Sequence, residues 1–190
     1  TVTTDSNGRF LIERLKKGFY TITELDVPNR YVVPKPQVVE VKPGRTTEVQ
    51  FNNVLKKFHI YITKSDVETG GTPQGDATLS GAVYHIYDAW GNHVDTVVGD
   101  GPIAKSKLLV LGTYTVYEVQ PPEGYNINMN PVTVHGDFEG QTVEIGRADT
   151  GIQDPVIKGQ VALVKFADKP LIEGNVDDGG IKTPLAGVEF

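Results

Sequence analysis

The sequence predicts an all-β protein built from tandem antiparallel β-sandwich modules. Glycine (21) and proline (12) make up about a sixth of the 190 residues, which favours frequent turns and excludes a helical bundle. Short segments alternate apolar and polar residues with the period of two that strands require. Paired turn residues stand between them, at Pro43-Gly44, Gly70-Gly71, Gly91-Asn92 and Asp100-Gly101.

Each strand is predicted from the alternation of apolar and polar residues within its own segment. In the strand at 58–64, Phe58, Ile60 and Ile62 share one face with Lys64. The same pattern recurs at residues 20–24, 49–55, 114–118 and 152–156. Every one of these segments places a charged or amide side chain in phase with apolar neighbours.

Three pairs of similar segments indicate a tandem repeat. The pairs are Gly18–Tyr31 with Gly112–Tyr125, Phe58–Asp66 with Gly159–Asp168, and Leu79–Ala82 with Leu185–Val188. They predict the later part of one module at 1–55, a complete module at 56–157, and the opening part of a further module at 158–190. Because a part module cannot bury a core alone, we expect the opening part of one chain to complete the later part of a neighbour, head to tail.

Composition excludes several classes of protein. The net charge is -6 and the basic residues are scattered, so we expect no nucleic-acid partner. No apolar run approaches the roughly 20 residues of a membrane span, so we expect no membrane insertion in this segment. The absence of cysteine excludes disulfides and zinc–thiolate sites, and we expect neither a cofactor nor a metal. Any covalent staple must therefore come from another chemistry.

Several other residues are catalytic, metal-binding or ligand-binding candidates by type, and their spacing favours structural positions. The four histidines are His59, His85, His93 and His135. None stands at catalytic or metal-binding spacing, so we expect surface or strand-face positions. Asp66–Gly71 and Asn175–Gly180 lack the ligand pattern of a calcium loop and are interpreted as solvated turns. Trp90 lies in a hairpin turn, where it covers a loop or makes a binding contact.

Charged residues on a buried face should be rare, because an unpaired buried charge is costly. The predicted strands nevertheless contain two sets of charged or amide residues on the face expected to be buried. The members are Lys64, Glu118 and Asp154 in the complete module, and Lys165, Glu24 and Asn53 in the two partial ones. An amide or acid side chain stands 11 residues before each lysine, at Asn53 before Lys64 and at Asp154 before Lys165.

These segments resemble the Cna B-type domain, the prealbumin-like, Ig-like repeat of Gram-positive surface adhesins and pilins. The matching residues are Ile62–Asp66, Leu79–Ala82 and Tyr114–Tyr125. The resemblance implies a spontaneous isopeptide bond between the strand lysine and an Asn or Asp of the last strand, assisted by the glutamate. In the complete module this gives Lys64 to Asp154 with Glu118.

For the split module the resemblance implies a bond from Lys165 to Asn53, with Glu24 as the catalytic residue. Arg30 departs from the pattern, because it stands where the repeated segment usually has glycine. The chemistry agrees with burial, since the neutral amine is the nucleophilic form of lysine and a protonated glutamate can shuttle protons. The alternative is that Lys64 snorkels at a strand edge beside a solvated Glu118.

The sequence as a whole predicts a structural stalk segment of a Gram-positive cell-surface adhesin or pilin. We expect it to be extracellular, anchored to the cell wall in the parent protein, and in contact with neighbouring modules of that protein. It is not predicted to be an enzyme, since self-cross-linking is a single turnover. Two alternatives stay open: a ligand-binding adhesin module for a host matrix protein such as collagen or for a glycan, and an accessory domain of a secreted enzyme.

Overall fold

The computed structural model describes residues 1–167, 183–184 and 186–190, and all of their regular structure is β-strand. This confirms the all-β prediction. No helix in these residues could cross a membrane. The strands are β1 (Gly18–Ile22), β2 (Tyr31–Val32), β3 (Gln37–Val41), β4 (Val54–Leu55), β5 (Lys57–Asp66), β6 (Val83–Asp88), β7 (His93–Val98), β8 (Ile103–Lys105), β9 (Leu109–Val110), β10 (Thr113–Gln120), β11 (Val132–His135), β12 (Ile145–Asp154), β13 (Phe166–Ala167) and β14 (Thr183–Pro184).

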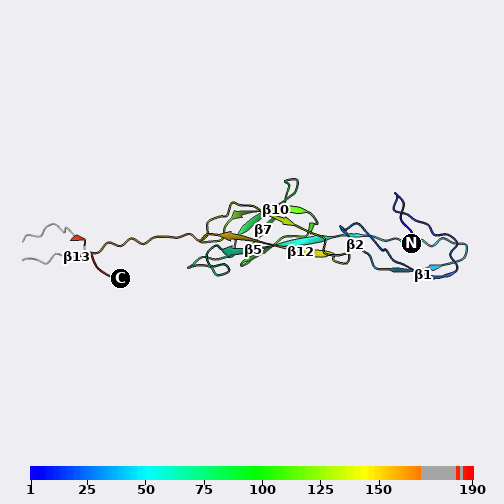
Figure 1. Cartoon of the computed structure of the whole chain (residues 1–190), viewed down its shortest axis with the longest axis horizontal. Coiled ribbons are helices and arrows are strands. Elements are labelled where there is room, and N and C mark those ends of the chain that lie inside the picture. The colour runs from blue at the N-terminus through cyan, green and yellow to red at the C-terminus, as the bar shows by residue number, and fades with distance from the viewer. Residues whose placement is uncertain (168–182, 185) are drawn as a thin grey trace, which may run out of the picture. The chain divides into compact units, whose positions relative to one another are not determined.

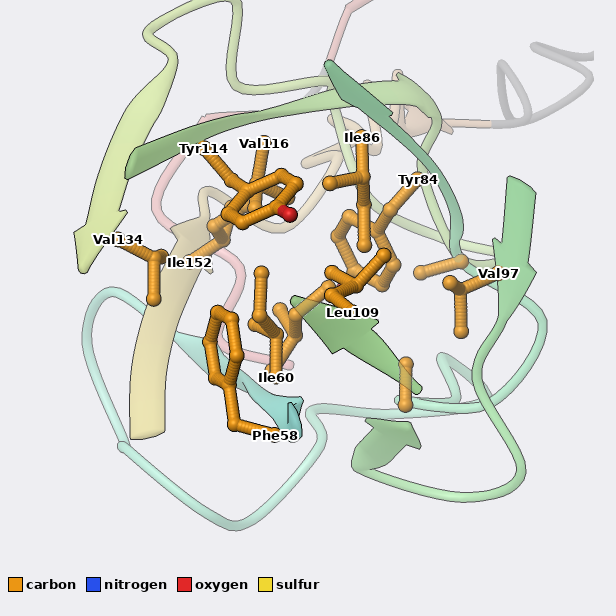
Figure 2. Close-up of a cluster of buried hydrophobic side chains, with 13 residues drawn as sticks. Phe58, Ile60, Tyr84, Ile86, Val97, Leu109, Tyr114, Val116, Val134 and Ile152 are labelled. Atoms are coloured by element: carbon orange, nitrogen blue, oxygen red, sulfur yellow. The ribbon is translucent and has the colours of Figure 1, made fainter. Parts of the chain in front are cut away.

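Two sheets form a sandwich between residues 57 and 154 (Figure 1). One sheet has the order β11-β10-β6-β7, and the other has the order β12-β5-β8 with β9 also paired to β5. Inward side chains of both sheets form one core, in which Phe58, Ile60 and Ile86 are almost fully buried (Figure 2). Each such side chain stabilises the fold by roughly 1.5–3 kcal/mol.

The first and last long strands of this sandwich, β5 and β12, are parallel neighbours. Their register runs from Ile145 opposite Lys57 to Asp154 opposite Asp66. The other strand pairs of the sandwich are antiparallel, as expected. The parallel pair is an addition to the predicted architecture, because alternation identifies the face of a residue and not the direction of its strand.

The segment that follows β10 requires glycine at one position. Gly124 has φ +86°, a left-handed conformation that favours glycine, and a Cβ there would lie 2.6 Å from the Cβ of Ala77. Thr78 N–H donates to the carbonyl of Glu123 across the same contact. Arg30, at the equivalent place in the first copy, has no positive φ, so the departure from glycine costs no strain there.

The chain divides into two compact units, Thr1–Val156 and Ile157–Phe190. Within the first unit, β1 pairs with β3 and β2 with β4 in antiparallel ribbons. Residues 1–55 expose apolar side chains, with Phe19 75% and Leu25 72% exposed, while Val27 is buried. In the second unit, β13 pairs with β14. The predicted turn Asn175–Gly180 and much of the predicted opening module lie outside the described residues.

Candidate cross-linking site

Three predicted site residues of the complete module lie together in the sandwich interior. Lys64 comes from β5, Glu118 from β10 and Asp154 from β12, and their exposed fractions are 2%, 5% and 0%. Lys64 Nζ lies 2.6 Å from Glu118 Oε1 and 2.5 Å from Asp154 Oδ1. None of these three is the solvated edge residue that the alternative interpretation requires.

The pairing of the strands explains why these three side chains lie together. Lys64 continues the inward face of β5 after Ile62, and Ile152 is its Cα partner on β12. Asp154 is therefore diagonal to Lys64 on the same face, within reach of a long side chain. Glu118 faces them from the opposite sheet, beside a register shift in the β10–β6 ladder.

Burial raises the pKa of Glu118 above its ordinary value. The Lys64 side chain and the N–H of Asn128, which donates to Oε2 at 3.1 Å, act against this shift. The neighbouring Asp154 carboxyl raises the pKa further. Glu118 thus holds a proton to a higher pH than an exposed glutamate does, as a proton shuttle must.

The carboxylate of Asp154 has few competing contacts. Both of its oxygens are buried: Oδ1 is ion-paired with Lys64 Nζ, and among the described residues neither oxygen accepts a further hydrogen bond. An amine and a carboxyl carbon are therefore held together in a site closed to water, which lowers the entropic part of the barrier to amide formation.

The predicted residues of the split module are arranged differently. Asn53 is exposed, Glu24 is half-buried, and Asn53 Nδ2 donates to Glu24 Oε2 at 3.2 Å. Lys165 is exposed and belongs to the second compact unit. The structure thus brings together the acceptor and the glutamate of this set within one unit.

Two buried polar residues were not predicted from the sequence: Tyr84, a candidate for the site, and Asp66, a structural carboxylate. Tyr84 is 1% exposed, and its hydroxyl is buried with no hydrogen-bond partner in the described residues. Asp66 is fully buried, so interpreting it as part of a solvated turn is wrong, although the turn exists as a bridge from Asp66 to Gly70. A signal was available for Tyr84, which is in phase with Ile86 in an alternating segment.

An aromatic cluster lies on the outer face of the β11-β10-β6-β7 sheet. We call His85, Tyr87, His93 and Tyr117 the outer-face cluster. The ring centroids of His85 and His93 are 4.8 Å apart, and those of Tyr87 and Tyr117 are 5.5 Å apart. The histidines are on strand faces as predicted, but cross-strand pairing brings two of them together. Trp90, in the turn after β6, is 85% exposed and therefore does not cover a loop.

The two facing sheets with one shared core define the chain as a β-sandwich protein. It belongs to the family of SpaA prealbumin-like fold domains, whose sequence model matches residues 1–55 and 59–149. This membership confirms the resemblance inferred from the repeated segments. In the described residues, no group of three or more His, Asp or Glu side chains could hold a metal ion.

Solved structures similar to this chain include the Bacillus anthracis TIE protein and two streptococcal pilins. The Bacillus anthracis TIE protein matches with a TM-score of 0.65 and 29% identity, over 81% of this chain and 28% of its own length. The T6 backbone pilin of Streptococcus pyogenes matches with a TM-score of 0.38 and 26% identity, over 43% of this chain and 16% of the pilin.

A minor pilin of the Gram-positive pathogen Streptococcus agalactiae matches with a TM-score of 0.43 and 12% identity, over 85% of this chain and 70% of the pilin. This chain spans less than a third of the TIE protein. A search of curated protein sequences found no match.

Proposed function

We propose that this chain is a stalk segment of a Gram-positive surface adhesin or pilin, and that an autocatalytic isopeptide bond from Lys64 to Asp154 stabilises its complete module. The observation that supports this most is the 2.5 Å approach of the buried Lys64 amine to the buried Asp154 carboxyl, whose oxygens accept no further hydrogen bond in the described residues. In the parent protein, the segment is extracellular and anchored to the cell wall.

The proposed reaction is one amide condensation. Lys64 gives up a proton and its neutral Nζ adds to the carboxyl carbon of Asp154, forming the C–N bond. Glu118 passes the two protons that leave Lys64 to one Asp154 oxygen, the C–O bond breaks, and water departs. A neutral amide replaces two buried charges, which removes their desolvation penalty. Each chain reacts once, so this is self-modification and not turnover.

The bond suits a structural role because it joins the first and last strands of the sandwich. Nearly the whole module then lies within one covalent loop. By the chain-entropy account of cross-links, a loop of this size stabilises the fold by ~4–5 kcal/mol.

Intact-mass measurement tests the proposal. The wild-type chain is expected to lack the mass of one water, and Glu118→Ala is expected to restore that mass and to lower the free energy of unfolding by ~4 kcal/mol. Glu123→Ala is the matched control, since Glu123 is an exposed glutamate of the same segment. A wild-type chain of unmodified mass would overturn the proposed bond.

For the split module we propose that the segment around Lys165 of a second copy of this chain binds beside Asn53 and Glu24. Support comes from the Asn53–Glu24 hydrogen bond and from the exposed apolar side chains of residues 1–55. Intact-mass spectra of the same samples test this bond. A Lys165–Asn53 bond between chains appears as a covalent dimer lighter by one additional ammonia, and Asn53→Ala abolishes that dimer.

A second candidate, a glycan-binding adhesin module, is favoured by the outer-face cluster. Its tyrosine rings can stack on the apolar faces of sugars, and its histidines can hydrogen-bond to hydroxyls. Loss of glycan-array binding in Tyr117→Ala, with an unchanged intact mass, would support this function. Absence of binding by the wild-type chain would exclude it for the glycans tested.

A further inference from the structure

Tyr84 combines a deeply buried side chain with an unused hydrogen-bond donor. Its ring lies among the core side chains (Figure 2), and its hydroxyl has no partner within the described part of the chain. Burying a hydroxyl without an acceptor costs stability, and phenylalanine would fill the same space without that cost. The hydroxyl therefore calls for a role other than packing.

The strand register places Tyr84 beside the candidate site. On β6 it is the Cα partner of Glu118 on β10, and both side chains point into the sandwich. Asp154, which faces Glu118, has two buried oxygens: Oδ1 is ion-paired with Lys64 Nζ at 2.5 Å, and among the described residues neither oxygen accepts a further hydrogen bond. A hydroxyl without a partner and a carboxylate with acceptor sites to spare thus occupy one buried cluster.

The local charges keep this donor protonated. Burial raises the pKa of Tyr84, and the nearby charges of Glu118 and Asp154 raise it further. The hydroxyl can therefore donate a hydrogen bond at neutral pH without releasing its proton.

We propose that the Tyr84 hydroxyl is a catalytic hydrogen-bond donor to the Asp154 oxygen that becomes negative when Lys64 Nζ adds to the carboxyl carbon. The inference rests on the proposed isopeptide bond. In the addition step the C–N bond forms and the electron pair of the C=O bond moves to oxygen, where Tyr84 donates while keeping its own proton. Water later leaves with the protons that Glu118 transfers. Donors aimed at a developing oxyanion accelerate acyl transfer by roughly 10²–10³.

Cell-free synthesis of the full chain tests the proposal, with samples quenched in denaturant at intervals and the loss of water followed by intact mass. Tyr84→Phe is expected to react 10- to 100-fold more slowly and, in the end, to lose one water completely from its own calculated mass. Tyr114→Phe is the matched control, because Tyr114 is a core tyrosine whose hydroxyl donates to the carbonyl of Val110 instead. The Tyr114→Phe chain is expected to be less stable than wild type but to lose water at the wild-type rate.

The outcomes separate the two proposals. If the wild-type chain never loses water, the isopeptide bond fails and the role of Tyr84 fails with it. If the wild-type chain and Tyr84→Phe lose water at the same rate, the role of Tyr84 fails and the bond stands. Thermal unfolding of the finished proteins is a second measurement. A Tyr84→Phe chain markedly less stable than wild type would place the hydroxyl in a structural hydrogen bond and overturn its catalytic role.

Discussion

At the scale of the residue, the pKa values of two buried carboxyls, Glu118 and Asp66, are shifted in opposite directions. Glu118 has an elevated pKa because its desolvation outweighs the contacts that favour its charge. Asp66 is also desolvated, but the N–H groups of Glu68 and Thr69 and the side chains of Tyr125 and Gln74 donate to it, and they lower its pKa to about 2. Asp66 is therefore suited to structure, and Glu118 to proton transfer.

Asp66 should make the stability of the module depend on pH in acid. Its pKa is about 2 in the folded chain and about 3.9 in an unfolded one, so its contribution is complete above about pH 4. The contribution is lost as the pH falls from about 4 to about 2. Urea unfolding across this range is expected to show a steeper loss of stability in the wild-type chain than in Asp66→Asn.

Asp76→Asn is the control for this measurement, because Asp76 is an exposed aspartate ten positions further along the chain. It is expected to keep the wild-type slope of unfolding free energy against pH. Equal slopes for the wild-type chain and Asp66→Asn would show that the carboxylate of Asp66 does not gain from its four donors.

At the scale of the element, alternation predicted which face each strand buries, and the inward positions of Lys64, Glu118 and Asp154 follow from it. It could not predict that β12 runs parallel to β5, because parallel and antiparallel strands share one alternation. Asp66 is in phase with Lys64 on β5, so the same alternation points it inward, and the interpretation of residues 66–71 as a solvated turn overlooked that signal. Alternation could not predict the hydrogen bond to Asp66 from Tyr125, which is distant in sequence.

The turn after β10 offers a test at this scale. Gly124→Ala puts a Cβ into a left-handed backbone and against Ala77, so it is expected to lower the free energy of unfolding by about 1–3 kcal/mol. Gly71→Ala is the matched control, since a Cβ there meets nothing within 4 Å and its φ is not left-handed. Denaturant titration of both variants checks this. A Gly124→Ala chain as stable as the control would contradict the close approach to Ala77.

At the scale of the whole molecule, the parallel pairing determines how a cross-linked module would carry tension. Lys57 begins β5 and Asp154 ends β12, so parallel strands put the entry and the exit of the chain at opposite ends of the sandwich. A bond from Lys64 to Asp154 would carry force from β5 directly to the exit. The strands between them, β6 to β11, would then bear no load.

Force spectroscopy on the full chain, held at its two ends, checks this path. The cross-linked wild-type chain is expected to show no release of the residues between Lys64 and Asp154, because the amide is covalent and does not break at the forces that unfold β-sandwiches. Glu118→Ala leaves the strands joined by noncovalent contacts alone. It is expected to add an unfolding step of roughly 300 Å, at 3.3–3.6 Å for each residue released. Glu123→Ala should behave as wild type, and a step of that length in the wild-type chain would mean that tension passes through the sandwich rather than across the bond.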